Sequence, residues 1–174
     1  MAKLIIVNGQ SCGGKSTTIK ALLENHKHFF KLSYDNVKRF YVDYKPDTHL
    51  DMVYEMLASL SKTAIAQGYD CISDGGWRGE NTKHIIEIFE EHGYKIYEFN
   101  IEADISVIRD RFEKRIIESA EKNIPISNTS VERLEQLNDV YQLEKNKKAV
   151  TYRSDQMTTE KIVAGIEREC GLSK

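Results

Sequence analysis

The sequence contains few of the residues that interrupt or cross-link a chain. Two prolines and three cysteines occur in 174 residues. The cysteines, at positions 12, 71 and 170, are odd in number, lie far apart and have no metal-ligand spacing. We interpret them as free thiols in a reducing cytoplasm. No Ser/Gly-rich or low-complexity segment suggests a linker, so we expect a single domain over residues 1–174.

Long apolar runs and a strong charge imbalance are also missing. No stretch approaches the roughly 20 apolar residues that a membrane span needs. The first residues do not have the layout of a signal peptide, which favours a cytoplasmic protein. The formal net charge is −2, so the composition does not indicate a nucleic-acid-binding or membrane-binding surface.

Short apolar segments alternate with amphipathic segments along the chain. We predict strands at residues 3–7, 28–33, 69–73, 94–101 and 148–153. We predict helices from Lys15, at 49–67, at 81–93, from a cap at Asp104 to about 120, at 131–145 and at 158–170. This alternation predicts a three-layer α/β fold, with a parallel sheet between two layers of helices.

The segment NGQSCGGKSTT, residues 8–18, comes after the first predicted strand and opens the first predicted helix. It has the Gly-x4-Gly-Lys-Ser pattern of a P-loop, whose backbone N–H groups surround a phosphate at a helix N-terminus. Lys15 would reach the β- and γ-phosphates, and Ser16 would bind Mg²⁺. We therefore predict ATP and Mg²⁺ as ligands. The residues expected at the ATP phosphates are Gly9, Gln10, Ser11, Cys12, Gly13, Gly14, Lys15, Ser16 and Thr17.

The sequence beyond the P-loop disfavours two classes of P-loop protein. A GTPase would need a guanine-reading Asn-Lys-x-Asp, and the sequence contains no such tetrapeptide. A motor ATPase would normally have an apolar strand that ends in two acids. The segment YDCISDGGWRG has one acid, Asp74, at the end of its predicted strand. Together with the size of the chain, these features favour a small kinase.

The P-loop, Asp35, the segment DGGWR at 74–78 and the arginines Arg111 and Arg115 together resemble the nucleoside-monophosphate-kinase-like group. This group includes adenylate, shikimate and gluconate kinases, polynucleotide kinase and chloramphenicol phosphotransferase. The resemblance spans nearly the whole chain. It implies five parallel strands in the spatial order 2-3-1-4-5, and a small helical lid at about residues 115–131.

The resemblance also implies roles for three arginines. Arg111 and Arg115 are four residues apart and so share one helix face. In the resembling kinases an Arg-x3-Arg at this place marks the beginning of the lid segment. By this resemblance Arg111 would pack on adenine and Arg115 would stabilise the transferring phosphoryl group. Arg153 would line the adenine pocket. The alternative for the pair is a solvated face, with Asp110 and Glu113 as partners.

Asp35 comes after the second predicted strand and is a candidate catalytic base. A carboxylate at the analogous position of chloramphenicol phosphotransferase and polynucleotide kinase takes the proton of the acceptor hydroxyl, and the resemblance implies this role for Asp35. The alternative is that Asp35 only caps a helix. Arg39 would bind an anionic acceptor or face solvent.

The segment DGGWR has the spacing of the Asp-Gly-x-Pro-Arg segment of adenylate kinase, whose arginine holds the phosphate of the acceptor nucleotide. The resemblance implies that Arg78 binds the acceptor, although Trp77 stands where that segment has proline. Trp77 would stack on the acceptor or complete the core. Asp74 would hold Mg²⁺, directly or through water.

The sequence thus predicts an ATP-dependent phosphotransferase that moves the γ-phosphate to a hydroxyl or phosphate of a small molecule. It does not identify the acceptor or the oligomeric state. A nucleotide or nucleoside kinase, a polynucleotide 5′-hydroxyl kinase and a nucleotide-binding regulator without transfer activity are alternatives. The near-neutral charge disfavours the polynucleotide kinase, because strand binding usually needs a basic groove.

Overall fold

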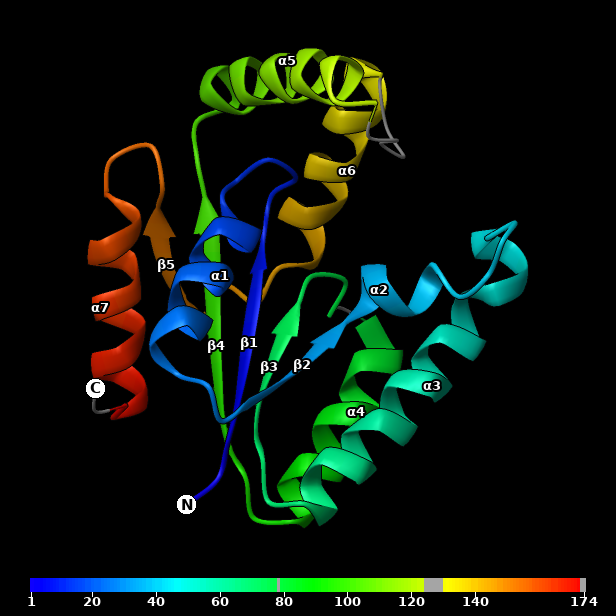
Figure 1. Ribbon diagram of the computed structural model, residues 1–174, viewed down its shortest axis with the longest axis vertical. Coiled ribbons are helices and arrows are strands. Elements are labelled where there is room, and N and C mark those ends of the chain that lie inside the picture. Colours follow the sequence, from blue (N-terminus) through cyan, green and yellow to red (C-terminus); the bar gives the residue numbers. More distant parts are fainter. Residues whose placement is uncertain (78, 124–129, 173–174) are drawn as a thin grey trace.

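The computed structural model describes residues 1–77, 79–123 and 130–172 (Figure 1). The strands of this part of the chain are β1 (Lys3–Gly9), β2 (Phe29–Ser33), β3 (Asp70–Asp74), β4 (Lys95–Glu102) and β5 (Val150–Arg153). Its helices are α1 (Lys15–Asn25), α2 (Tyr34–Lys38), α3 (Pro46–Ala66), α4 (Gly79–Glu91), α5 (Ile105–Glu121), α6 (Val131–Glu144) and α7 (Thr159–Cys170). The predicted strands and helices are therefore present, with bounds that differ by a few residues.

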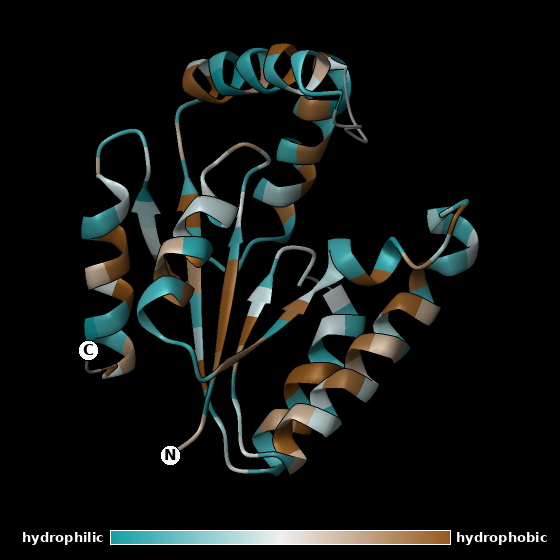
Figure 2. Ribbon diagram, viewed as in Figure 1, coloured by the Kyte–Doolittle hydropathy of each residue, from teal (hydrophilic) through white to brown (hydrophobic). Residues whose placement is uncertain are grey.

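The five strands form one parallel sheet in the order β2-β3-β1-β4-β5. This confirms the fold class and the strand order that the resemblance implied. The central strand β1 is buried on both faces, as its apolar run at the middle of the sheet in Figure 2 illustrates. Leu4 and Ile6 pack toward α3 and α4, whereas Ile5 and Val7 pack toward α1 and α7.

Two helix starts differ from the predictions for local reasons. Helix α3 begins at Pro46, because proline suits the first turn of a helix. A helix capped by Asp35 was the alternative for this segment, but the cap of the short helix α2 is Ser33, whose hydroxyl accepts a hydrogen bond from the N–H of Asn36. Asp35 therefore lies inside the first turn, so the prediction that it could cap the helix was wrong.

Helices α5 and α6 lie beyond the carboxyl ends of the strands (Figure 1). We refer to these two helices as the upper lobe. They share a small apolar cluster of Ala103, Ile108, Phe112 and Leu134. The lid predicted at about 115–131 falls at the end of α5 and the start of α6. Its residues 124–129 lie outside the described residues, so the lid stays a prediction.

The register of the sheet brings three candidate segments to one edge. Asp74 at the end of β3 pairs with Val7 of β1 and with Ser33 of β2. The P-loop after β1 therefore lies next to Asp74 and to the start of α2. Ligands of open parallel sheets bind at this carboxyl edge. None of the described helices has the length and apolar composition that a membrane span requires.

Candidate active site

The glycines of the P-loop are required by its close approach to β4. A Cβ atom on Gly9 would lie 2.1 Å from the carbonyl oxygen of Ile101, and one on Gly13 would lie 2.9 Å from the same oxygen. Gly14 caps α1 in the left-handed region, with a φ of 99°. The first N–H groups of a helix have no acceptor within it and favour an anion. The loop thus presents the start of α1 to a phosphate.

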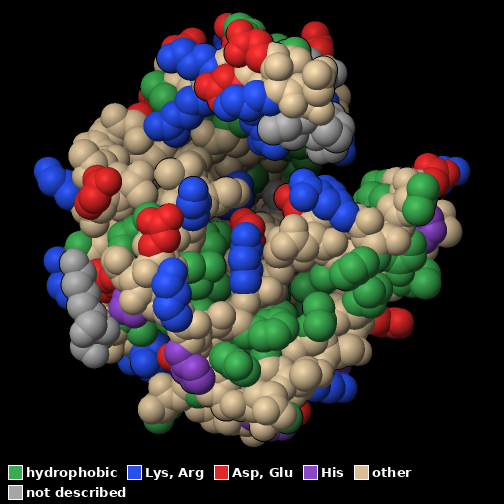
Figure 3. Space-filling model, in the orientation of Figure 1, with side chains coloured by type: hydrophobic (Ala, Val, Ile, Leu, Met, Phe, Trp, Pro, Cys, Tyr) green, Lys and Arg blue, Asp and Glu red, His purple; other side chains and the backbone are tan. Residues whose placement is uncertain are grey.

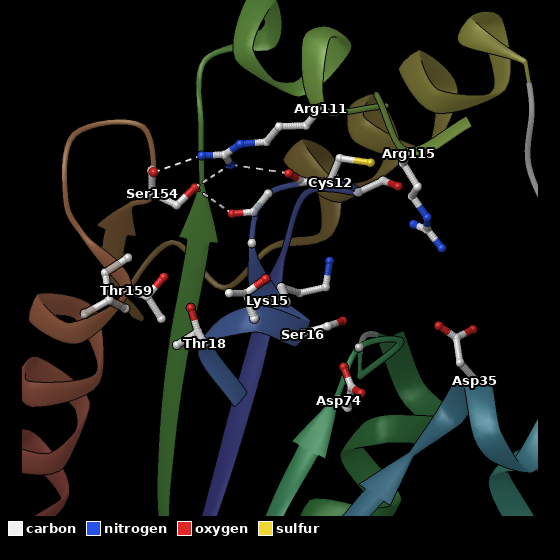
Figure 4. A pocket seen from close by; sticks show the side chains of 16 residues that line it. Cys12, Lys15, Ser16, Thr18, Asp35, Asp74, Arg111, Arg115, Ser154 and Thr159 are labelled. Atoms are coloured by element: carbon white, nitrogen blue, oxygen red, sulfur yellow. Dashed lines mark hydrogen bonds between the residues drawn. The ribbon is translucent and has the colours of Figure 1, made fainter. Parts of the chain in front are cut away.

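A cavity of about 500 Å³ lies above the P-loop, and Figure 3 shows a hollow between the upper lobe and the body of the molecule. Four predicted residues from distant parts of the sequence reach the cavity together with residues 11–17 of the loop (Figure 4). They are Asp35, Asp74, Arg111 and Arg115. Ser154, Thr159 and Ile162 complete its wall, and none of these three was predicted.

Lys15 lies at the floor of the cavity (Figure 4). Its ammonium group donates hydrogen bonds to the carbonyl oxygens of Gly9 at 3.0 Å and Gln10 at 2.8 Å. These contacts hold the positive charge beside the loop, where a bound phosphate chain would need it.

Two carboxylates point into the cavity from the side opposite Arg115 (Figure 4). The Asp74 side chain is 15% exposed and pairs with Lys31 at 2.6 Å. The Asp35 side chain pairs with Lys38 at 2.5 Å. Because it is also 61% exposed, a molecule in the cavity can reach it. The Asp74 carboxylate and the Ser16 hydroxyl both line this cavity, and oxygen is the ligand type that Mg²⁺ prefers.

The described residues contain no group of three or more His, Cys, Asp or Glu side chains that could hold a metal ion. This is compatible with Mg²⁺, which is usually held by one or two protein oxygens, substrate phosphates and water. The residues present therefore fit a magnesium ion that is bound together with a nucleotide.

The two arginines of α5 that were predicted at the site, Arg111 and Arg115, differ in their surroundings. Arg111 donates hydrogen bonds to the hydroxyl of Ser154 at 2.8 Å, to its carbonyl oxygen at 2.9 Å and to the carbonyl oxygen of Cys12 at 3.4 Å. Arg115 is exposed and points down into the cavity (Figure 4). Arg111 is thus part of the wall, and Arg115 is the arginine that approaches the place above Lys15.

Arg153 does not lie where the sequence placed it. Its guanidinium donates to both carboxylate oxygens of Asp155, at 3.1 and 2.8 Å, and lies 3.6 Å from Asp104. Among the described residues that line the cavity, Ser154 is present and Arg153 is absent. Ser154, in the turn directly after β5, reaches the cavity instead. The Arg153 guanidinium lowers the pKa of Asp155 to about 2.

Trp77 is 2% exposed and belongs to the core cluster between the sheet and helices α3 and α4. Its ring is therefore not available to stack on an acceptor, which corrects that prediction in favour of the core alternative. Arg39 is exposed at the end of α2 and is not among the described residues that line the cavity. Arg78 lies outside the described residues.

A second cavity of about 140 Å³ adjoins the first on the side of Asp35. The two share Ser11, Lys15, Asp35 and Gly75. The second extends to Asn8, Gly9, Gly76, Leu137 and Tyr141. Leu137 and Tyr141 belong to the helix predicted at 131–145, and only the fold reveals that residues of this helix line a cavity beside the P-loop.

The wall of the second cavity depends on a glycine pair. Gly75 and Gly76 have φ angles of 69° and 71°, which favour glycine. A Cβ on Gly76 would lie 2.8 Å from the ring of Tyr34, and the carbonyl oxygen of Gly76 accepts a hydrogen bond from Tyr54 at 2.5 Å. Burial and the neighbouring hydroxyl of Tyr44 raise the pKa of Tyr34, so this tyrosine stays protonated.

Comparisons with known proteins concern the family and the fold of the chain. A family model described as an AAA domain matches residues 4–144. Among curated proteins, no significant match is found.

Solved structures similar to this chain include a Chloroflexus aurantiacus protein assigned as a candidate kinase. Its TM-score is 0.71 at 18% identity, over 96% of this chain and 97% of that one. The Mycobacterium tuberculosis APS kinase, in complex with AMPPNP and APS, has a TM-score of 0.66 at 12% identity, over 98% of both chains. The Deinococcus radiodurans tunicamycin resistance protein has a TM-score of 0.64 at 14% identity, over 99% and 98%. At such identities the likeness concerns the fold.

Proposed function

The chain belongs to the AAA domain family, and from this premise and its kinase-like fold we propose that it is an ATP-dependent phosphotransferase. The acceptor would be a small molecule that carries a hydroxyl or phosphate group. One observation carries the proposal: a single cavity combines the P-loop with Arg115, Asp35 and Asp74. Phosphoryl transfer needs cations around the transferring group and a carboxylate beside the attacking hydroxyl, and this cavity contains both.

Binding of ATP would rest on the P-loop. The N–H groups at the start of α1 would surround the β-phosphate, and Lys15 would contact the β- and γ-phosphates. Arg115, which points into the same cavity, would contact the equatorial oxygens of the transferring group. These donors stand where negative charge develops, so they would stabilise the transition state more than the ground state.

Magnesium would be held by the Ser16 hydroxyl and, directly or through water, by Asp74. When bound, the ion neutralises charge on the phosphate oxygens. Lys31 keeps the Asp74 carboxylate in place by their 2.6 Å ion pair.

Asp35 would orient the acceptor hydroxyl and accept its proton. Its carboxylate lines both adjoining cavities, so it stands between the P-loop and the space toward Gly76 and Tyr141. We assign that space to the acceptor. The proton of the hydroxyl would pass to Asp35 as the oxygen bonds to the γ-phosphorus and ADP leaves.

The relatives in fold support this proposal. The Mycobacterium tuberculosis APS kinase was solved with AMPPNP and APS, which are a nucleotide analogue and a nucleotide acceptor. Its fold matches nearly the whole of the present chain. A donor site for ATP and a separate acceptor site therefore fit this architecture.

The experiment is an ATP-consumption screen with Mg²⁺ against nucleosides, nucleotides, sugars, amino alcohols, antibiotics and 5′-hydroxyl oligonucleotides. We expect one small-molecule class to stimulate ATP consumption, and Lys15→Ala to abolish the stimulation. Stimulation by oligonucleotides alone would identify a polynucleotide kinase. ATP binding that no acceptor converts into turnover would identify a nucleotide-binding regulator and contradict the proposal.

A further inference from the structure

The first half of the P-loop is held by hydrogen bonds from the upper lobe. The side-chain oxygen of Gln10 accepts a hydrogen bond from the N–H of Ala103, just before α5, at 2.9 Å. The N–H of Ser11 donates to the side-chain oxygen of Asn138 on α6, also at 2.9 Å. Both partners of the loop lie outside it and outside α1, one in the connection that leads into α5 and one on α6.

The second half is held by α5 and by the turn after β5. The carbonyl oxygen of Cys12 accepts from Arg111 at 3.4 Å, and that of Gly13 accepts from the hydroxyl of Ser154 at 2.7 Å. Arg111 in turn donates to the Ser154 hydroxyl at 2.8 Å (Figure 4). One serine thus links α5 to the loop.

These contacts surround a residue in an unfavourable conformation. Cys12 has a φ of 59°, in the left-handed region that side chains other than glycine rarely adopt. Its side chain packs against the apolar cluster of the upper lobe. Such a conformation persists only where the surrounding structure holds it. The hydrogen bonds to residues 10–13 therefore serve to hold Cys12 in this conformation.

The surroundings of Asn138 indicate that this residue is needed for its hydrogen bond to Ser11 and not for packing. It is 3% exposed, and its Nδ2 atom has no hydrogen-bond partner among the described residues. Because the N–H of Ser11 can only donate, the amide oxygen must face the loop. A buried donor without a partner lowers stability, and a leucine of similar size would avoid that loss. The hydrogen bond from Ser11 offers a reason why an asparagine stands at this position despite that loss of stability.

We propose that Asn138 and Ser154 are positioning residues that hold the P-loop in its phosphate-binding shape and couple it to α5 and α6. The inference rests on the proposed function, in which the loop binds the phosphates of ATP. With residues 10–13 held from above, the N–H groups at the start of α1 keep one arrangement before the ligand arrives. Such preorganisation lowers the cost of ordering the site on binding.

Titration with AMPPNP and Mg²⁺ tests this positioning role. We expect Asn138→Ala to weaken binding about tenfold, the size of one lost hydrogen bond. Asp139→Ala, exposed on the same helix, is the matched control and should bind like wild type. Ser154→Ala should also weaken binding about tenfold, and Ser154→Thr, which keeps the hydroxyl, should recover most of the loss.

Hydrogen exchange of the nucleotide-free protein separates positioning from general destabilisation. In Asn138→Ala the peptide that covers residues 8–18 should exchange faster, while a peptide from α3 should not change. Asn138→Asp retains the acceptor oxygen and should restore the protection of residues 8–18. Faster exchange over the whole chain would indicate a structural role only and would overturn the proposal.

The positioning role and the proposed function can be contradicted separately. If wild type binds AMPPNP and both alanine variants bind equally well, the positioning role is wrong and the proposed function stands. If wild type itself does not bind AMPPNP, the proposed function is wrong and this inference is wrong with it.

Discussion

At the scale of single residues, the site depends on atoms that are missing as much as on those present. Gly9 and Gly13 have no side chain where the carbonyl oxygen of Ile101 approaches, and this lets the P-loop turn against β4. The pattern Gly-x4-Gly-Lys-Ser could be recognised from the sequence because it encodes this local constraint. Which distant carbonyl group imposes the constraint could not, because the contact joins segments about ninety residues apart in the chain.

The contact of Gly9 with β4 predicts a large loss of stability on substitution. Gly9→Ala should lower the free energy of unfolding by about 3 kcal/mol or more, because backbone atoms must move to admit the methyl group. Gly93→Ala is the control, since its φ of 74° is similarly restricted but nothing lies within 4 Å of the added Cβ. It should lose only about 1–2 kcal/mol. Urea unfolding measures both, and equal losses would contradict the steric account.

Asp35 is predicted to affect turnover without affecting ATP binding. Asp35→Asn keeps the shape of the side chain but cannot accept a proton, so kcat with the identified acceptor should fall about 10²- to 10⁴-fold. The affinity for AMPPNP should change little. Asp43→Asn, an exposed carboxylate paired with Lys45, should leave kcat unchanged. A near-wild-type kcat for Asp35→Asn would remove the base from the mechanism.

At the scale of elements, the turn after β5 joins the P-loop to the start of α5. Asp155 accepts hydrogen bonds from Arg153 and from the N–H of Asp104, the cap of α5. Ser154 contacts the P-loop from the same turn. The strand and the helix on either side were predictable from periodicity. Which residue of the turn between them contacts the P-loop was not, because this depends on how the turn packs against distant segments.

The Arg153–Asp155 ion pair predicts that the stability of the protein falls at acidic pH. The folded protein holds the pKa of Asp155 at about 2, below its ordinary value of 3.8. A lowered folded pKa adds stability that is present above pH 3.8 and is lost as the pH falls toward 2. Asp155→Asn should therefore destabilise the protein at pH 6 and have a much smaller effect near pH 2.

Urea unfolding of wild type and Asp155→Asn across this range measures the difference. Asp139→Asn, at an exposed position of α6, is the control for replacing a carboxylate by an amide. A difference between wild type and Asp155→Asn that stays constant from pH 6 to pH 2 would contradict the lowered pKa.

At the scale of the whole molecule, the site is assembled from segments that the sheet order brings together. The P-loop comes after β1, Asp74 ends β3, Asp35 lies in the helix after β2, and Arg115 comes from α5. The alternation of elements and the resemblance together predicted the order that makes them neighbours. They did not predict that α6 would line the second cavity, and they left open whether Trp77 would be buried, because both depend on how helices pack over that edge.

The central claim is that the γ-phosphate of ATP passes to an acceptor and not to water. The most direct measurement supplies [γ-³²P]ATP and Mg²⁺ with each member of the acceptor panel, and separates labelled acceptor from labelled inorganic phosphate. The account predicts label on one class of small molecule with wild type and none with Lys15→Ala. Label that appears only as inorganic phosphate, or equally with Lys15→Ala, would contradict it.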